Sequence, residues 1–449
     1  MNKRLKYIFF VIAIAILSQY SAGQSIKGFE KYSKVIRENI YKNYKGMYRP
    51  SGGALNYPFL TPGSEAYADV LWDWDSWLSN IALRQILMDT GNDANKKEAS
   101  IYEQGCVLNF LSFCYSDGWM PVMIDRKSDI SSLKPKNIYE ENMHKPCLAQ
   151  HAAFLIKENN GNAEWLREKF ANLQYFVDGY KNRYRNASTG LYFWQNDVMI
   201  GVDNDPCTFY RPDRSSGSIF LNCLMYKELN AMVYLCERLN FNEIGEQYKV
   251  DASNLKEAIQ KNCWDERDGF FYSVDLNLKP INTEKWAYHG GAPRDWNCLI
   301  QRIGVWSGFL AMWADIATPE QAKRMVEEHY KNTKTFNSPF GIRTLSKMEK
   351  MYSLKASGNP SSWLGPIWGI SNYMTWRGLV KYGFTNEAKE LASKSILLFG
   401  QDFERYGTLH EYYQPDNGEP ILNAGFQNWN YLVLNMLNWI ENKKVIEEF

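Results

Sequence analysis

The sequence predicts an all-α protein whose helices close into an (α/α)6 toroid, and three observations predict this class. Apolar residues recur at three- and four-residue steps in a long series of segments. The strict alternation typical of half-buried strands is rare, and no linker rich in Pro, Gly or Ser divides the chain. The expected helices cover residues 26–44, 72–90, 95–116, 145–158, 163–184, 215–239, 242–263, 300–316, 319–331, 362–382, 385–400 and 424–442.

These segments can pair as antiparallel hairpins, with six inner helices surrounded by six outer ones. An open solenoid is the competing all-α architecture, but the chain shows no fixed repeat period of the kind that such arrays have. We therefore expect one domain over residues 24–449.

The first 23 residues have the pattern of a secretory signal peptide. Lys3, Arg4 and Lys6 precede the apolar run 7–17, and the small residues Ser21-Ala22-Gly23 follow it. The run is about half the length needed to span a bilayer. We expect cleavage after residue 23, export to the periplasm or the exterior of a bacterium, and no stable membrane insertion of the mature chain.

The expected helices are supported by apolar residues that fall on one face. In 215–239, Ile219, Cys223, Tyr226 and Val233 fall on one side of the expected helix. In 424–442 the apolar positions that share a face are Phe426, Trp429, Val433, Met436 and Ile440. The long connections 185–214, 264–299, 332–361 and 401–423 are rich in Gly, Pro, Asp, Asn and aromatic residues, and such loops on a rigid frame commonly carry binding and catalytic groups.

Charge and metal-ligand counts exclude several classes of function. Removal of the signal peptide would change the formal net charge from +1 to −2, which excludes strong non-specific attraction to nucleic acid. The eight Cys form no CxxC pair and the five His show no metal-ligand spacing, so we expect no metal and no cofactor. The cysteine pattern assigns no disulfide pairing.

The aromatic content points to a carbohydrate ligand. The chain has 16 Trp and 29 Tyr, many of them beside Asp, Glu, Asn or Arg. A sugar ring has C–H faces that pack on aromatic rings and a rim of hydroxyls that needs polar partners. For a single Trp inside a helix, a role in the core is the better interpretation, so the clusters carry the argument.

The first cluster is Leu71-Trp72-Asp73-Trp74-Asp75-Ser76-Trp77, at the start of an expected helix. One of the two acids, Asp73 or Asp75, is expected to cap that helix. A cap needs only one acid, so the other is free to accept sugar hydroxyls, and we expect Asp75 to do so.

The second cluster is Gly201-Val202-Asp203-Asn204-Asp205-Pro206, in a loop that leads to Arg211 and Arg214. A simple turn would explain this composition, and a calcium loop is a further alternative, although the acidic spacing of an EF-hand is missing. The third cluster, 364–369, precedes a helix. In the fourth, 410–420, Asp416-Asn417-Gly418 is typical of a turn and leaves Glu411 among aromatic residues.

With these four clusters in this order, the chain resembles glycoside hydrolase family 63 and its relatives, the trehalases and the mannosylglycerate or glucosylglycerate hydrolases. The matching stretches are LWDWDSW, GVDNDP, GPIW with the following NYMTWRGL and YGF, and HEYYQPDNGEP. The resemblance extends from about residue 70 to 435. It implies an (α/α)6 barrel and an inverting, α-glucosidase-like hydrolase with a general acid at Asp203 and a general base at Glu411.

Two departures from the family pattern concern positive charge. Relatives often continue the acid motif through Ser-Pro-Arg, whereas here Cys207 follows Asp205-Pro206, so a basic contact is missing or is supplied by Arg211 or Arg214. The relatives' motif Ser-Gln-Pro-Pro is replaced by His144-Lys145-Pro146-Cys147. Lys145 therefore pairs with a family acid or meets an anionic group on the substrate.

An inverting mechanism requires the two carboxyl groups to stand about 6.5–9.5 Å apart across one pocket, with Asp203 protonated and Glu411 ionised. Burial beside aromatic residues and the nearby Asp205 would help Asp203 to keep its proton. His410 is expected to be a structural hydrogen-bond partner. The residues expected to bind the substrate are Trp72, Trp74, Asp75, Trp119, Lys145, Arg211, Arg343, Trp363, Trp368 and Gln427.

Two other functions remain open at this stage. Polysaccharide lyases and sugar epimerases also use (α/α) toroids, and Tyr288, His289 and Arg294 are residue types that such enzymes use to abstract a proton. A non-catalytic glycan-binding protein is the other, although the presence of both Asp203 and Glu411 argues against it. The sugar, the linkage, the aglycone and the oligomeric state are not determined by the sequence.

Overall fold

The computed structural model describes residues 28–91, 93–137, 140–278, 296–356 and 358–449. The expected signal peptide and the three residues of the lyase or epimerase alternative, Tyr288, His289 and Arg294, lie outside the described residues. Within the described part of the chain, no helix is long and apolar enough to cross a membrane.

The described helices alternate along the chain between an outer and an inner layer. The outer layer contains the helix over residues 28–43, α3 (Asp93–Ser112), α6 (Phe170–Arg183, preceded by η4, Glu164–Lys169), α9 (Asn242–Cys263), α11 (Pro319–Arg324, continued by η8, Met325–Tyr330) and α13 (Thr385–Tyr406). The inner layer contains α2 (Asp73–Thr90), α5 (Leu148–Glu158), α8 (Ile219–Leu239), α10 (Leu310–Trp313, preceded by η7, Trp306–Phe309), α12 (Gly369–Lys381) and α14 (Val433–Ile440, preceded by η9, Asn428–Leu432).

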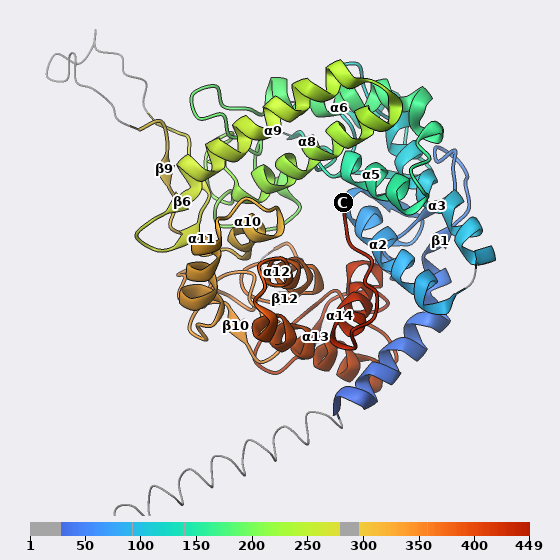
Figure 1. Ribbon diagram of the computed structural model, residues 1–449, viewed down its shortest axis with the longest axis vertical. Coiled ribbons are helices and arrows are strands. Elements are labelled where there is room, and N and C mark those ends of the chain that lie inside the picture. Colours follow the sequence, from blue (N-terminus) through green and yellow to red (C-terminus); the bar gives the residue numbers. More distant parts are fainter. Residues whose placement is uncertain (1–27, 92, 138–139, 279–295, 357) are drawn as a thin grey trace, which may run out of the picture.

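The inner helices form a closed ring. Going round it, α2 contacts α5, α5 contacts α8, α8 contacts α10, α10 contacts α12, α12 contacts α14, and α14 returns to α2 (Figure 1). This closure confirms the (α/α)6 toroid.

Burial explains why each helix takes its layer. In α12 every residue from Gly369 to Leu379 is buried, as expected for a helix that is covered on all sides. In α9 the buried positions are spaced by three or four residues, among them Tyr248, Ala252, Leu255 and Ile259. That spacing gives α9 one apolar face, which packs on α8.

Short antiparallel strand pairs shape the loops between the helices. They are β1 (Tyr48–Arg49) with β2 (Phe59–Leu60), β3 (Val70–Trp72) with β4 (Met123–Asp125), β6 (Trp264–Asp265) with β7 (Phe270–Phe271) and β10 (Asn337–Ser338) with β11 (Gly341–Ile342). Two sheets have three strands, with β8 (Val274–Asp275) between β5 (Ser216–Gly217) and β9 (Leu299–Ile300), and β13 (Tyr412–Tyr413) between β12 (Ile367–Trp368) and β14 (Pro420–Ile421). The shortest helical elements are η1 (Tyr44–Met47), η2 (Glu65–Tyr67), α4 (Ile130–Leu133) and α7 (Asp197–Ile200).

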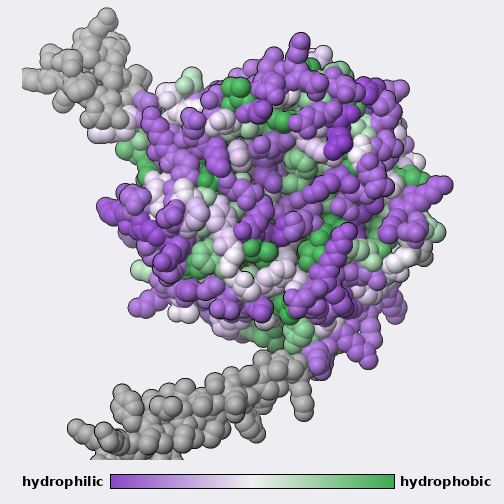
Figure 2. Space-filling view, in the orientation of Figure 1, coloured by the Kyte–Doolittle hydropathy of each residue, from purple (hydrophilic) through white to green (hydrophobic). Residues whose placement is uncertain are grey.

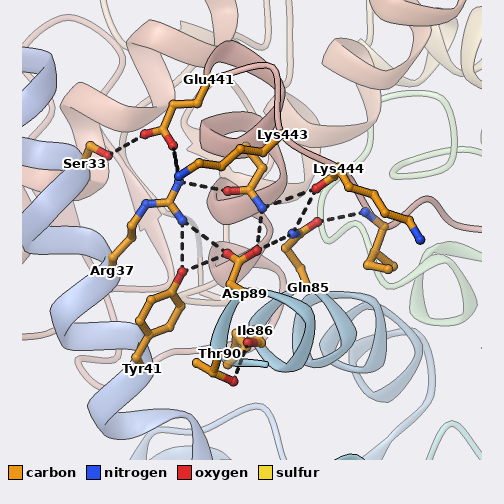
Figure 3. Close-up of polar contacts among 12 residues, drawn as sticks. Ser33, Arg37, Tyr41, Gln85, Ile86, Asp89, Thr90, Glu441, Lys443 and Lys444 are labelled. Carbon is orange, nitrogen blue, oxygen red and sulfur yellow. Dashed lines mark hydrogen bonds and ion pairs between the residues drawn. The ribbon is translucent and has the colours of Figure 1, made fainter. Parts of the chain in front are cut away.

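A polar network joins the first hairpin to the last (Figure 3). Arg37 donates hydrogen bonds to Asp89 at the end of α2, to Asn438 in α14 and to Glu441 just beyond it, at 3.2, 2.8 and 2.8 Å. Tyr41 donates to the same Asp89 carboxylate at 2.8 Å. Because these residues come from both ends of the chain, the network holds the ring closed.

The C-terminal segment lies across the axis of the toroid, near the middle of the ring in Figure 1. The buried Glu448 carboxylate accepts hydrogen bonds from Trp313, Tyr373 and Arg377. Burial by itself raises the pKa of Glu448, but Arg377 and neighbouring lysines outweigh burial and lower it to about 2. The surrounding surface on this face is mostly hydrophilic, with small apolar areas between the polar residues (Figure 2).

Four helix starts lie four or more residues later than the sequence expectation. The segments expected to start at 300, 362, 215 and 424 begin their helical structure at residues 306, 369, 219 and 428. Residues 362–368 were expected to be helical but lie before α12. They include Gly365, at φ +136°, and Pro366, and neither residue suits a helix interior. The eight cysteines are all free thiols.

Candidate active site

A pocket of about 520 Å³ lies at the end of the toroid where several inner helices begin, a volume typical of a site for one small ligand. It receives side chains from the first turn of α2, the approach to α5, the turn after α7, the approach to α12 and the β13–β14 hairpin. Its lining residues are Tyr67, Trp72, Asp73, Trp74, Asp75, Val122, Asn142, Lys145, Asp197, Val198, Gly201, Asp203, Asn359, Pro360, Ser361, Trp363, Trp368, Glu411, Leu422, Asn423, Phe426 and Trp429.

Glu411 is held by two hydrogen-bond donors. The Tyr67 hydroxyl lies 2.9 and 3.0 Å from its two carboxylate oxygens, and the Asn423 side-chain amide lies 2.5 Å from Oε2. Burial raises the pKa of Glu411, the two donors oppose this rise, and the charge of Asp203 adds to it. The donors therefore favour the ionised carboxylate and fix its orientation.

The hairpin after Glu411 explains why Asn423 lies beside it. Tyr412 pairs with Ile421 in the β13–β14 ladder, so Glu411 and Leu422 face each other at its end, and the Glu411 N–H donates to the Leu422 carbonyl at 3.2 Å. The backbone is left-handed at Leu422 (φ 60°) and Asn423 (φ 42°). Each such residue costs about 1–3 kcal/mol and is typical of functional sites.

His410 anchors the other side of Glu411. Its ring Nδ1 and its backbone N–H each lie 3.0 Å from the Asp402 carboxylate, and the Tyr413 hydroxyl donates to the same carboxylate at 2.8 Å. The Asn430 amide donates to the His410 carbonyl at 2.7 Å. These hydrogen bonds show that His410 has the structural role expected for it.

Asp203 lies in the turn after α7 and its half-buried side chain lines the same pocket as Glu411, 208 positions away in the chain. The next residue, Asn204, has a left-handed backbone (φ 68°), and its amide donates to the Ser361 carbonyl at 2.9 Å. The turn is thereby tied to the loop that precedes α12.

Two further acids belong to this turn. Asp197 lines the pocket and accepts a hydrogen bond from the Thr208 hydroxyl at 2.7 Å. Burial raises the pKa of Asp197 to about 6, with a smaller contribution from Asp203. Asp205 is buried outside the pocket lining, where the Cys207 N–H donates to its carboxylate at 2.7 Å, and burial raises its pKa to about 7.

Lys145 and Asp73 form a buried ion pair in the pocket wall. The Lys145 ammonium lies 3.1 Å from Asp73 Oδ2, and the Lys145 backbone N–H donates to the same oxygen at 2.9 Å. The Lys145 side chain also passes close to Gly201 (φ +67°), where an added Cβ would lie 2.4 Å from Lys145 Cε. Of the two roles left open for Lys145, the structure shows the pairing with an acid.

Asp75 also lies in the pocket wall, and the expectation that Asp73 or Asp75 caps α2 is wrong. The N-cap is Trp72, which makes no capping hydrogen bond, while Asp73 is engaged by Lys145 and Asp75 accepts a hydrogen bond from Asn428. Burial raises the pKa of Asp75 to about 8; Asp73 adds to the rise and Lys145 opposes it.

Aromatic rings form one side of the pocket. Trp363 and Trp368 stack with centroids 4.1 Å apart, Tyr412 stacks on Trp368 at 4.8 Å, and Trp306 stacks on Trp363 at 6.0 Å. Trp74 lies 6.1 Å from Trp363 at an interplanar angle of 32°. Of these rings, Trp74, Trp363 and Trp368 line the pocket and offer aromatic surface beside carboxylates, the combination that a sugar ring with its hydroxyls requires.

Residues 68–430 match the mannosylglycerate hydrolase MGH1-like glycoside hydrolase domain. The chain belongs to this family. The match confirms the resemblance that the four sequence clusters indicate.

Individual relatives agree with this membership. The cytosolic neutral trehalase of Kluyveromyces lactis is 29% identical over 212 residues, 45% of this chain and 25% of the trehalase. The probable mannosyl-oligosaccharide glucosidase of Schizosaccharomyces pombe is 22% identical over 306 residues, 65% of this chain and 34% of that protein. The chain thus spans a quarter to a third of the length of these relatives.

The fold is shared with a solved glycoside hydrolase. The GH63 mannosylglycerate hydrolase from Thermus thermophilus, in complex with glucose, superposes with a TM-score of 0.61 at 17% identity, covering 86% of this chain and 96% of that one. This likeness shows the fold.

Within this family domain, eight of the twelve side chains singled out from sequence line one pocket. They are Asp203, Glu411, Trp72, Trp74, Asp75, Lys145, Trp363 and Trp368.

The other four lie outside the lining of that pocket, and two of them are arginines in ion pairs of their own. Arg211 pairs with Asp275, and Arg343 lies 2.9 Å from Asp416 and also donates to backbone carbonyls. Arg214, the other candidate basic contact to the acid, donates to the Arg183 carbonyl at 3.0 Å.

The remaining two lie elsewhere in the fold. Trp119 is buried and packs edge-on against Tyr115, with centroids 5.2 Å apart. Gln427 lines a separate cavity, where its amide lies 3.4 Å from the Asn43 carbonyl.

Sequence reasoning missed Tyr67, Asn423 and Asp197. A signal for Asn423 was present, because the expected turn at 416–418 implies a hairpin that returns the chain to Glu411. Tyr67 precedes the first cluster in a stretch without a motif, so nothing in the sequence marked it.

Across the described residues, no group of three or more His, Cys, Asp or Glu side chains is placed to hold a metal ion. Although five carboxylates line the pocket, Asp73 is bound to Lys145 and Glu411 to Tyr67 and Asn423. The chemistry available in the pocket is that of carboxyl groups, hydrogen-bond donors and aromatic faces.

Proposed function

We propose that this chain hydrolyses an α-glycosidic bond, with α-glucosides as the favoured substrates, and inverts the anomeric centre. Asp203 acts as the general acid and Glu411 as the general base. The observation that carries the proposal is that these two carboxyl groups, 208 positions apart in the chain, line one aromatic-walled pocket. Membership of a glycoside hydrolase family supports it.

The assigned roles follow from what each carboxyl group must do. Asp203 donates its proton to the glycosidic oxygen as the bond to the leaving group breaks. Glu411 removes a proton from a water molecule that attacks the anomeric carbon from the opposite face. Tyr67 and Asn423 support the second role, because hydrogen bonds donated to a carboxylate favour its ionised form and fix its orientation.

The remaining side chains of the pocket are proposed to bind the sugar. Trp74, Trp363 and Trp368 offer apolar aromatic surface for its C–H groups. Asp75 offers an acceptor and Lys145 an ammonium donor for its hydroxyls.

Paired isosteric variants test the proposal, assayed on an alkyl α-glucoside and on α-glucosyl fluoride. Asp203→Asn removes the proton donor, so we expect a severe loss with the alkyl glucoside and a milder loss with the fluoride, which departs without protonation. Glu411→Gln leaves the water unactivated, so both substrates are expected to suffer alike.

A control variant and the opposite outcomes complete this experiment. Asp205→Asn removes an acid of the same loop that lies outside the pocket lining, and it should not reproduce the substrate-dependent pattern of Asp203→Asn. Full activity of Glu411→Gln on both substrates would contradict the assignment. Binding of glycans without any hydrolysis would favour a glycan-binding protein.

We also propose that the protein is exported, on the basis of its N-terminal leader pattern. Expression of the full chain in a Gram-negative host, followed by fractionation and N-terminal sequencing, is expected to yield a periplasmic protein that begins near Gln24. A cytoplasmic product that retains Met1 would contradict export.

A further inference from the structure

The pocket carries an unbalanced negative charge. Among its described lining residues are five carboxyl groups, those of Asp73, Asp75, Asp197, Asp203 and Glu411, and one cationic side chain, Lys145. Lys145 is already paired with Asp73, at 3.1 Å, and its side chain is 2% exposed. Its charge is therefore neutralised within the wall.

The imbalance persists when the protonation of each group is considered. Near neutral pH, Asp75, with its pKa raised to about 8 by burial, is mostly uncharged, and the general-acid role proposed for Asp203 requires that carboxyl group to carry its proton. Lys145 cancels Asp73. Among the described lining residues, no further cation then compensates Asp197 and the proposed base Glu411.

The two arginines expected to contact an anion, Arg211 and Arg343, do not neutralise the excess negative charge of the pocket. Arg211 is engaged by Asp275 and Arg343 by Asp416, and neither lines the pocket. A carboxylate that enters would meet like charges in a partly buried space, where Coulomb repulsion is much stronger than in water. It would also lose its hydration without gaining an ion-pair partner.

We propose that this pocket selects glycosides with a neutral leaving group and excludes those whose aglycone carries a carboxylate, such as glycerate. The inference rests on the proposed function and narrows its substrate class. Mannosylglycerate, the substrate in the name of the family, would then be a poor substrate for this chain. The hydrogen-bond acceptors that suit neutral hydroxyl groups repel an anion.

A matched pair of ligands tests this inference by binding. Glucosylglycerol and glucosylglycerate, both α-linked, differ in one position, where a hydroxymethyl group replaces a carboxylate, and the mannosyl pair offers the same comparison. Titration calorimetry with Asp203→Asn, in which a neutral amide stands for the protonated acid, avoids turnover. We expect the glycerol glycoside to bind at least about tenfold more tightly, equivalent to about 1.4 kcal/mol.

Charge variants identify the cause of the preference. Asp197→Asn in the Asp203→Asn background removes one uncompensated charge. It is expected to reduce the difference in affinity between the glycerol glycoside and the glycerate glycoside. Asp197→Glu in the same background keeps the charge and should preserve the gap. Added salt should strengthen binding of the glycerate glycoside and leave the glycerol glycoside nearly unaffected.

Three outcomes would overturn the inference. They are equal or tighter binding of the glycerate glycoside, a gap that Asp197→Asn leaves unchanged, and no binding of either glycerol glycoside. Failure of the proposed function is seen separately, as absence of hydrolysis of every α-glycoside by the unmodified enzyme. An enzyme that cleaves the glycerate glycoside preferentially would keep the proposed function and refute the selectivity.

Discussion

Replacement of Tyr67 by Phe should lower activity, because it removes a donor that keeps the Glu411 base ionised and oriented, without disturbing the fold. The Tyr67 hydroxyl lies 2.9 and 3.0 Å from the two Glu411 oxygens, and Phe fills the same space without a donor. Burial and the neighbouring Glu411 raise the pKa of Tyr67, so it remains a protonated donor throughout the working range. A hydrogen bond to a charged group contributes about 1.5–3 kcal/mol, which predicts a loss of about 10- to 150-fold in kcat/KM.

The pH profile of kcat/KM makes this prediction specific. The Tyr67 donor lowers the pKa of Glu411, so its loss raises that pKa, and the acidic limb of the profile should move to higher pH. As a control, Tyr382→Phe removes a hydroxyl that donates to the Ala317 carbonyl outside the pocket, and it should leave the limb in place. An acidic limb in Tyr67→Phe that stays unchanged or moves to lower pH would refute this account of the base.

Further predictions concern stability and metal dependence. Lys145→Met leaves the buried Asp73 charge unpaired and should cost about 3–5 kcal/mol in the free energy of unfolding. Addition of Asp73→Asn should recover part of that loss, and denaturant titration of both variants checks this; no recovery would contradict the pairing. Glu448→Gln should destabilise the protein by about 3 kcal/mol above pH 4.5, because the folded-state pKa of Glu448 is lowered to about 2, below its ordinary value of 4.5. This difference should shrink as the pH falls from about 4.5 towards 2, which unfolding curves at several pH values measure, and a difference independent of pH would contradict it. Activity should survive treatment with EDTA, since the described residues offer no metal-binding cluster, and its loss with recovery on adding Ca²⁺ would contradict this.

The helical layers were largely predictable from sequence, because apolar periodicity reports burial directly. The helix expected at 242–263 is α9, Asn242–Cys263, and the one expected at 72–90 is α2, Asp73–Thr90. The starts of α12 and of η7 were less predictable. There the apolar pattern continues into loop residues that are buried without being helical, such as Trp363.

The site was predictable where its residues occur in dense motifs. Asp75, Asp203 and Glu411 stand in such clusters and meet in one pocket. Arg343 shows the limit of this reasoning, because an arginine beside a loop looks the same in sequence whether it faces a ligand or another acid. Only the fold reveals its pairing with Asp416.

The central claim is that Asp203 and Glu411 are an inverting pair, and the anomer of the first-formed sugar tests it most directly. Proton NMR is recorded during the first minutes of hydrolysis of an α-glucoside, with enough enzyme that turnover outpaces mutarotation. The account predicts that the β-anomer appears first and then equilibrates with the α-anomer. Initial release of the α-anomer would contradict it, because retention requires a carboxylate nucleophile about 5–5.5 Å from the acid instead of a base with an intervening water.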